Sequence, residues 1–118
     1  MASNYIGHFV FTSAGIAQSA PDEIGVYYCG SINLQGNLVP HYIGRAMGPD
    51  TSIRSRLFDH VNSGGWANAT HFGFRICNSG AEAGQLESRE IAQFNPTHNV
   101  QGKADYPALL RALMGASK

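Results

Sequence analysis

The chain has 118 residues, a length typical of one domain, and we expect a single domain over residues 1–118 with its core module at about 22–100. Hydrophobic residues make up 43% and charged residues 14%, which fits a globular protein and excludes a disordered one. No stretch approaches the roughly 20 apolar residues of a membrane helix, and the N-terminus lacks a basic start, so we expect no membrane partner and a cytoplasmic location. The net charge is zero, which excludes a broad basic face and leaves only a local arginine patch for binding phosphate.

Cys29 and Cys77 are the only cysteines, and they form no Cys-x-x-Cys motif. A structural zinc site is therefore not expected. We interpret both as reduced, partly buried strand residues; the alternative is a disulfide between them.

The first part of the chain predicts a hairpin behind an N-terminal extension. Residues 8–13 are typical of a short strand, and a loop through residues 20–22 follows. Residues 25–30 are aromatic and β-branched, which predicts a strand. Residues 33–37, with Gly36, predict the hairpin turn, and residues 38–46 the return strand.

The next segments predict a helix and a third strand. The helix is expected to begin at Asp50 or Thr51 and to end at Gly64-Gly65, with an apolar stripe at Ile53, Leu57 and Val61. Residues 70–77 alternate apolar and polar side chains, which predicts the third strand.

A second helix follows. Ser79 and Glu82 have the spacing of a capping box, and Asn95-Pro96 predicts the helix end. One apolar stripe is expected from Ala83, Leu86, Ile91 and Phe94. A last, apolar helix is expected to begin near Asp105 or Tyr106 and to pack on the core or on another subunit. The element order favours an α/β (α+β) sandwich with a mostly antiparallel sheet.

Several side chains are candidates for chemistry on phosphate. Glu87 lies beside the apolar stripe of the second helix with no basic partner four residues later, so it is a candidate ligand for a hard cation such as magnesium; the alternative is an ordinary ion pair with Arg45 or Arg56. Arg56 and His60 share a helical face and could clamp a phosphate; the alternative is an Arg56–Asp59 surface pair with a solvated His60.

Two tyrosines of the hairpin are weaker candidates. Tyr27 and Tyr42 lie on its two strands, where facing tyrosines are usually packing partners, and a phenol activates water only if its pKa is lowered, for example by nearby cations. Gly44 leaves space beside Tyr42, either for substrate or for tight packing. Trp66 is interpreted as a packing anchor, with base stacking as the alternative. His8, His41, His71 and His98 are scattered and are interpreted as surface or hydrogen-bonded residues.

Taken together, these residues resemble the GIY-YIG nuclease family. Gly25-Val26-Tyr27 resembles its first signature, and Tyr42-Ile43-Gly44 matches the second. Arg56-Leu57-x-x-His60 resembles the following helix motif, and Glu87 with Pro96 and Asn99 resembles the metal-ligand helix and its ending. The resemblance covers residues 25–99.

The resemblance implies a β-β-α-β-α module with a central three-stranded antiparallel sheet. It assigns a single magnesium or manganese ion to Glu87, water activation to Tyr27 and orientation of water or phosphate to Tyr42. Arg56 would stabilise transition-state charge, and His60 would support the base or the phosphate. Arg45 and Gly44 would contact substrate, and Asn99 would hold the local geometry of the substrate site.

The implied activity is single-metal hydrolysis of DNA, with RNA as the less favoured substrate. The alternative is a catalytically inactive module of the same fold that binds nucleic acid or protein. Because 118 residues leave no room for an attached DNA-binding domain, target choice is expected to come from a partner protein, from a homodimer or from substrate shape. Repair, restriction, mobile-element and toxin roles stay open.

Overall fold

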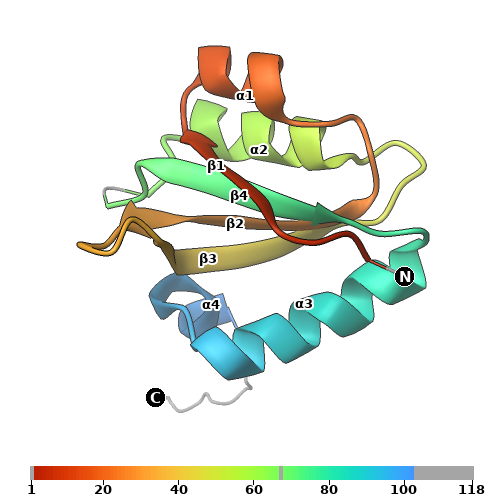
Figure 1. Ribbon diagram of the computed structural model, residues 1–118. Coiled ribbons are helices and arrows are strands. Elements are labelled where there is room, and N and C mark those ends of the chain that lie inside the picture. The colour runs from red at the N-terminus through yellow and green to blue at the C-terminus, as the bar shows by residue number, and fades with distance from the viewer. Residues whose placement is uncertain (1, 67, 103–118) are drawn as a thin grey trace.

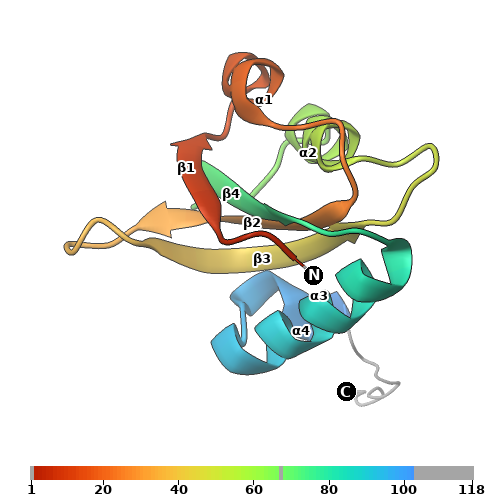
Figure 2. The same cartoon turned by 45° about the vertical axis from the view of Figure 1, so that its right-hand side comes forward.

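A four-stranded antiparallel sheet lies between two pairs of helices (Figures 1 and 2). The computed structural model describes residues 2–66 and 68–102. Helices α1 and α2 cover one face of the sheet, and α3 and α4 cover the other (Figure 1). The strands lie in the order β1-β4-β2-β3, so β3 forms one edge of the sheet. The expected α+β class is confirmed.

The predicted hairpin forms the half of the sheet that carries the candidate residues. Strand β2 (Gly25–Ile32) pairs with β3 (Leu38–Ala46), and the register places Tyr27 opposite Gly44. The turn has the expected chemistry: the Asn33 carboxamide oxygen accepts from the backbone N–H groups of Gln35 and Asn37, and Gly36 has a φ of 82°.

Of the other two strands, one completes the predicted three and one extends the sheet beyond them. Strand β4 (His71–Ile76) pairs with β2, which gives the expected central trio β4-β2-β3. The N-terminal strand β1 (Ile6–Val10) pairs with β4 and adds a fourth strand. It begins two residues earlier than expected, and helix α1 (Ser13–Ser19) occupies a segment expected to be strand end and loop. Only Ile16 of α1 is buried, so the sequence carries no apolar stripe that would have indicated this helix.

Helix α2 (Ile53–Asn62) begins later than expected because Ser52, not Asp50 or Thr51, is its N-cap. The Ser52 hydroxyl accepts from the Ser55 backbone N–H, and the Ser55 hydroxyl accepts from the Ser52 N–H, which satisfies two otherwise unpaired donors. The helix ends at Asn62, two residues before Gly64.

Helix α3 (Gly80–Phe94) begins after Ser79, as predicted, and Asn95 ends it in the left-handed conformation with a φ of 48°. The capping differs in one detail: the Glu82 carboxylate accepts from the Asn78 N–H instead of the Ser79 N–H. Ala83 and Leu86 are buried against the sheet, but Phe94 is 45% exposed, so its expected place in the stripe is wrong.

Helix α4 (Thr97–Gly102) follows directly and packs on β3. This helix was not expected, because six residues without an apolar stripe carry no periodic signal. The helix expected near Asp105 lies outside the described residues. Across the described part of the chain, no helix is both long and apolar enough to span a membrane.

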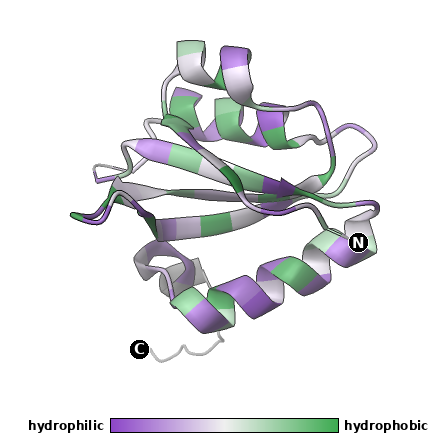
Figure 3. Ribbon diagram, viewed as in Figure 1, coloured by the Kyte–Doolittle hydropathy of each residue, from purple (hydrophilic) through white to green (hydrophobic). Residues whose placement is uncertain are grey.

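The core is divided by the sheet into two clusters. Tyr27, Leu57 and Phe72 belong to the cluster under α1 and α2, and Tyr28, Ile43 and Leu86 to the cluster over α3. Successive residues of β2 accordingly alternate between the two clusters, with Tyr27 and Cys29 in the first and Val26 and Tyr28 in the second. Figure 3 shows hydrophobic residues on the strands and on the helices of both layers. Cys29 and Cys77 are free thiols as interpreted, and both are buried.

Candidate active site

A cleft of about 380 Å³ opens beside the β3 edge, and five of the candidate residues line it. They come from four elements that are distant in sequence: Tyr27 from β2, Tyr42 and Arg45 from β3, Arg56 from α2 and Glu87 from α3. Two residues that the sequence did not single out, Met47 and Thr51, complete the wall. The cleft therefore brings a carboxylate, two phenols and two guanidinium groups around one space.

Gly44 makes room for the Tyr27 ring. The β2–β3 register places both residues on the sheet face that α2 covers, and a Cβ on Gly44 would lie 2.4 Å from the Tyr27 hydroxyl oxygen. Such a distance is far below van der Waals contact. Of the two explanations that the sequence left open for Gly44, this geometry supports tight packing.

Gly44→Ala is therefore expected to destabilise the fold by about 1–3 kcal/mol, because the added methyl group must displace the buried Tyr27 ring. Gly84→Ala is the matched control: a Cβ at Gly84 meets no atom within 4 Å, and alanine stabilises a helix interior by up to about 1 kcal/mol. Chemical denaturation of the two variants measures both effects. Equal stabilities would show that Gly44 does not create the space for Tyr27.

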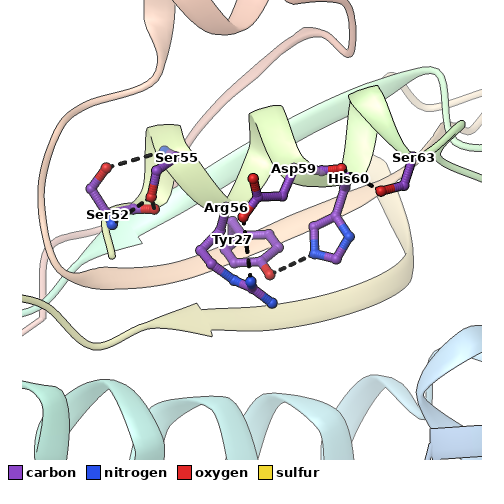
Figure 4. A network of polar contacts seen from close by, with 7 residues as sticks. All are labelled: Tyr27, Ser52, Ser55, Arg56, Asp59, His60 and Ser63. Carbon is purple, nitrogen blue, oxygen red and sulfur yellow. Dashed lines mark hydrogen bonds and ion pairs between the residues drawn. The ribbon is translucent and has the colours of Figure 1, made fainter. Parts of the chain in front are cut away.

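The Tyr27 hydroxyl is hydrogen-bonded to His60, at 2.8 Å from its Nε2 atom (Figure 4). The His60 ring is half-buried and packs against Tyr42 and Trp66, with ring centroids 5.2 and 4.8 Å away. Trp66 stacks on Tyr42 at 4.6 Å, which supports the interpretation of this residue as a packing anchor. The alternative of a solvated His60 is thus wrong. The hydrogen bond to Tyr27 and the ring contacts with Tyr42 and Trp66 hold the imidazole in place.

Burial sets the protonation state of this pair. It raises the pKa of Tyr27 well above its ordinary value of 10.0; the neighbouring Tyr42 adds to the shift, and Arg56 opposes it. Burial and the positive charge of Arg56 lower the pKa of His60 below 6.5. At neutral pH the phenol therefore keeps its proton and the imidazole is neutral, so Tyr27 can donate to Nε2 when the ring proton is on Nδ1. Arg56 is the nearby cation that the sequence led us to look for, but burial outweighs its effect on Tyr27.

Arg56 extends from α2 beside the Tyr27 phenol (Figure 4). Its Nη1 atom lies 3.5 Å from the Asp59 carboxylate, so the predicted surface pair is present. Asp59 is largely exposed, and an exposed pair of this kind contributes little and is easily exchanged. The Arg56 guanidinium both lines the cleft and retains donors for another anion.

Glu87 projects from α3 into the cleft, where its side chain is 13% exposed. Its Oε1 atom accepts a hydrogen bond from Arg45 Nη1 at 2.5 Å, which is the ion pair that the sequence left as the alternative to a metal ligand. The carboxylate charge also reaches Tyr42: burial raises the pKa of Tyr42, and the charge of Glu87 raises it further. Glu87 is therefore electrostatically part of the same site as the phenols.

These residues fit a single magnesium or manganese ion. Magnesium retains several waters and is typically bound by one or two carboxylates together with substrate phosphate oxygens, so it needs no cluster of protein ligands. Over residues 2–66 and 68–102, no three His, Cys, Asp or Glu side chains gather to hold a metal ion. Among the described residues, Glu87 is the carboxylate that lines the cleft, and Tyr27 and Tyr42 line the same cleft. A multi-ligand site of the zinc type is not formed by the described residues.

Asn99 acts on the backbone of β3. Its carboxamide oxygen accepts from the Ile43 N–H at 2.7 Å, and its NH₂ group donates to the Ile43 carbonyl at 2.8 Å. Two such bonds pair the outer side of an edge strand, which would otherwise expose unpaired groups. This arrangement fixes α4 on the strand that carries Tyr42 and Gly44, and it agrees with the structural role that the resemblance implies for Asn99.

No family model and no curated relative matches the sequence. Solved structures do match: the GIY-YIG N-terminal endonuclease domain of UvrC from Thermotoga maritima, bound to magnesium as its catalytic divalent cation, is 26% identical with a TM-score of 0.54. The match covers 70% of this chain and 92% of that one. A cation-bound point variant of the same domain is 25% identical, with a TM-score of 0.55, and covers 70% of this chain and 91% of that one. The resemblance drawn from the sequence motifs is confirmed in three dimensions: this chain has the fold of a GIY-YIG nuclease domain.

Proposed function

We propose that this protein is a metal-dependent endonuclease that hydrolyses phosphodiester bonds of DNA. The observation that carries the proposal is that one cleft is lined by the Glu87 carboxylate, by the phenols of Tyr27 and Tyr42 and by the guanidinium groups of Arg45 and Arg56. Phosphodiester hydrolysis needs a deprotonated water, neutralisation of charge on the phosphate and a stabilised leaving oxygen. The cleft offers groups suited to each of these tasks.

The chemistry expected of a magnesium or manganese ion held by Glu87 is stabilisation of the charge that builds on the phosphate and on the leaving oxygen. If Glu87 held a cation, its carboxylate would no longer pair with Arg45, and the Arg45 guanidinium would be available to a phosphate oxygen. Arg45 is 46% exposed and can turn toward the cleft opening. Arginine keeps its proton under all ordinary conditions, so Arg45 binds phosphate and does not act as a base.

Water activation runs through Tyr27 to His60. The attacking water gives a proton to the Tyr27 oxygen as the Tyr27 hydroxyl proton moves to His60 Nε2, so no free phenolate has to form. The resulting hydroxide oxygen forms a bond to phosphorus, the bond from phosphorus to the leaving oxygen breaks, and that oxygen takes a proton from solvent. The half-buried imidazole is available to accept the proton because its lowered pKa leaves it unprotonated at neutral pH.

Tyr42 and Arg56 hold the reacting groups in place. Tyr42 stacks on Trp66, which orients its ring, and its hydroxyl orients the water or the scissile phosphate. Arg56 stabilises the charge of the transition state from the α2 side of the cleft. Asn99 and Gly44 position β3 beneath the substrate through the contacts already described.

The proposal is tested by incubating the purified protein with supercoiled plasmid in magnesium and, separately, in EDTA. We expect nicked and linear products in magnesium and none in EDTA. The zero net charge and the Arg45–Glu87 ion pair favour one alternative, a noncatalytic module of the same fold that binds nucleic acid or protein. Binding of DNA without cleavage in either condition would support that alternative.

A parallel reaction with RNA of the same sequence tests the substrate class. We propose DNA as the preferred substrate and a partner protein, a second copy of the chain or substrate shape as the source of target choice. A cytoplasmic setting is proposed because Cys29 and Cys77 are both free thiols.

A further inference from the structure

The described arginines are distributed unevenly over the fold. Two of the five bind protein groups away from the cleft: Arg54 Nε donates to the Ala20 carbonyl, and Arg75 contacts the Ser3 carbonyl and Glu90. The other three are Arg45, Arg56 and Arg89. Arg45 and Arg56 line the cleft, and Arg45 and Arg89 line a second surface hollow along α3. Both lysines lie beyond the described residues. Three of the five described arginines therefore lie along the cleft and the adjoining face of α3.

A second hollow of about 620 Å³ continues from the cleft across the outer face of α3. Arg45 and Met47 line both hollows, so the two spaces meet at these residues. Beyond them the second hollow is floored by small residues of α3 and flanked by Gln85, Ser88 and Arg89. None of the described residues that line it carries a carboxylate, whereas Glu87 lines the cleft on the other side of Arg45.

We propose that this second hollow binds the sugar-phosphate backbone of the substrate beside the scissile bond. The proposal rests on the proposed nuclease function and extends it to a path for the substrate strand. The path runs from Arg56 in the cleft, past Arg45, to Ser88 and Arg89 on α3.

The side chains along α3 have the chemistry that phosphates require. Arg89, Ser88 and Gln85 are exposed and donate hydrogen bonds, and the guanidinium group of Arg89 can bind a phosphate through two parallel bonds. Residues 81 to 89 span about 12 Å of helix, which corresponds to roughly three base-pair rises of DNA. The floor of the hollow has no bulky side chain, so the backbone can approach the helix closely.

Gly84 provides a matched test of charge in this hollow. A Cβ at Gly84 meets no atom within 4 Å, so both Gly84→Glu and Gly84→Gln can be accommodated without displacing a neighbour. The two variants differ only in a negative charge. Arg89→Gln removes one positive charge from the same hollow, and Gln18→Glu places the same net change on α1, near the opposite edge of the sheet.

Binding of a fluorescein-labelled DNA duplex is measured by anisotropy in EDTA over a range of salt concentrations. We expect Arg89→Gln to weaken binding roughly three- to tenfold at low salt and to reduce the slope of log K against log salt by about 0.9. Gly84→Glu is expected to weaken binding at least as much, and more than Gly84→Gln, because both variants add bulk to the floor of the hollow and only glutamate adds a negative charge. Gln18→Glu, which lies outside the hollow, is expected to bind like the wild type.

Two contrary results have different meanings. If the wild type cuts DNA but Arg89→Gln and Gly84→Glu bind it as tightly as the wild type does, the path across α3 is wrong and the nuclease proposal stands. If the wild type neither binds nor cuts DNA, the nuclease proposal fails and the path fails with it.

Discussion

Replacing Glu87 with glutamine is expected to lower the rate of DNA cleavage roughly 10²–10⁴-fold or more while the fold stays intact. Glu87 is the carboxylate that lines the cleft, so its loss removes the proposed protein ligand of the metal ion. The glutamine amide oxygen keeps the size of the side chain and can still accept from Arg45. Because Arg45 is 46% exposed, losing the charge of this pair is expected to change stability by no more than about 1 kcal/mol.

Plasmid nicking gives the rate, and titration calorimetry with manganese gives a second readout that does not depend on activity. The wild type is expected to bind manganese and Glu87→Gln to lose that binding. Glu23→Gln is the control, because Glu23 is an exposed acid in the loop before β2 and lies outside the cleft. Wild-type nicking by Glu87→Gln would remove this carboxylate from the mechanism.

Removing the Tyr27 hydroxyl is expected to slow cleavage roughly 10²–10⁴-fold, the usual contribution of a positioned acid or base. Tyr27→Phe keeps the buried ring over Gly44 but breaks the path from water to His60 Nε2. It also leaves a half-buried imidazole nitrogen without its partner, which is expected to cost about 1–3 kcal/mol of stability.

Tyr28→Phe is the matched control for this variant. Tyr28 is the next residue of β2, it faces the other side of the sheet, and its hydroxyl donates to Glu90 at 2.5 Å. The same atom is removed at both positions, and each loses one partly buried hydrogen bond. We expect a similar loss of stability from both variants, and slower cleavage only from Tyr27→Phe.

The pH profile of the wild type tests the role of His60. A protonated imidazole cannot accept the proton from Tyr27, so kcat/KM is expected to fall as the pH drops through the pKa of His60. Burial and Arg56 place that pKa below 6.5, so the acid limb should lie below pH 6.5 and the rate should be steady just above it. A profile without an acid limb, or wild-type cleavage by Tyr27→Phe, would contradict the path through this pair.

The sequence determined the elements that have a strong local signal. The hairpin over β2 and β3, its Asn33 turn and the start of α3 at Ser79 agree with expectation, because side-chain alternation, turn residues and caps are properties of neighbouring residues. The order of the motif residues was also enough to indicate the fold. Signals of this kind do not depend on what the rest of the chain does.

Elements with weak local signals form because tertiary packing stabilises them. Helix α1 buries a single residue and α4 is six residues long, so neither has a periodic pattern, and both are stabilised by the layers they cover. Phe94 continues the stripe of α3 by spacing, but its ring is 45% exposed and lines a surface hollow with Leu38 and Pro40 of β3. Spacing predicts which face of a helix a residue is on and does not predict how closely the neighbouring layer packs against it.

The chemistry of the cleft depends on contacts between residues distant in sequence. The order of the motifs identified Tyr27, His60 and Glu87 as candidates. Only the tertiary structure shows that Tyr27 is hydrogen-bonded to His60 and that Glu87 forms an ion pair with Arg45. It also decides the pKa directions, because burial depends on every layer around a side chain and outweighs the nearby charge of Arg56 at Tyr27. The sequence by itself thus determined which groups are available, and the packing of α2 and α3 against the sheet decided which of them meet and in which protonation state.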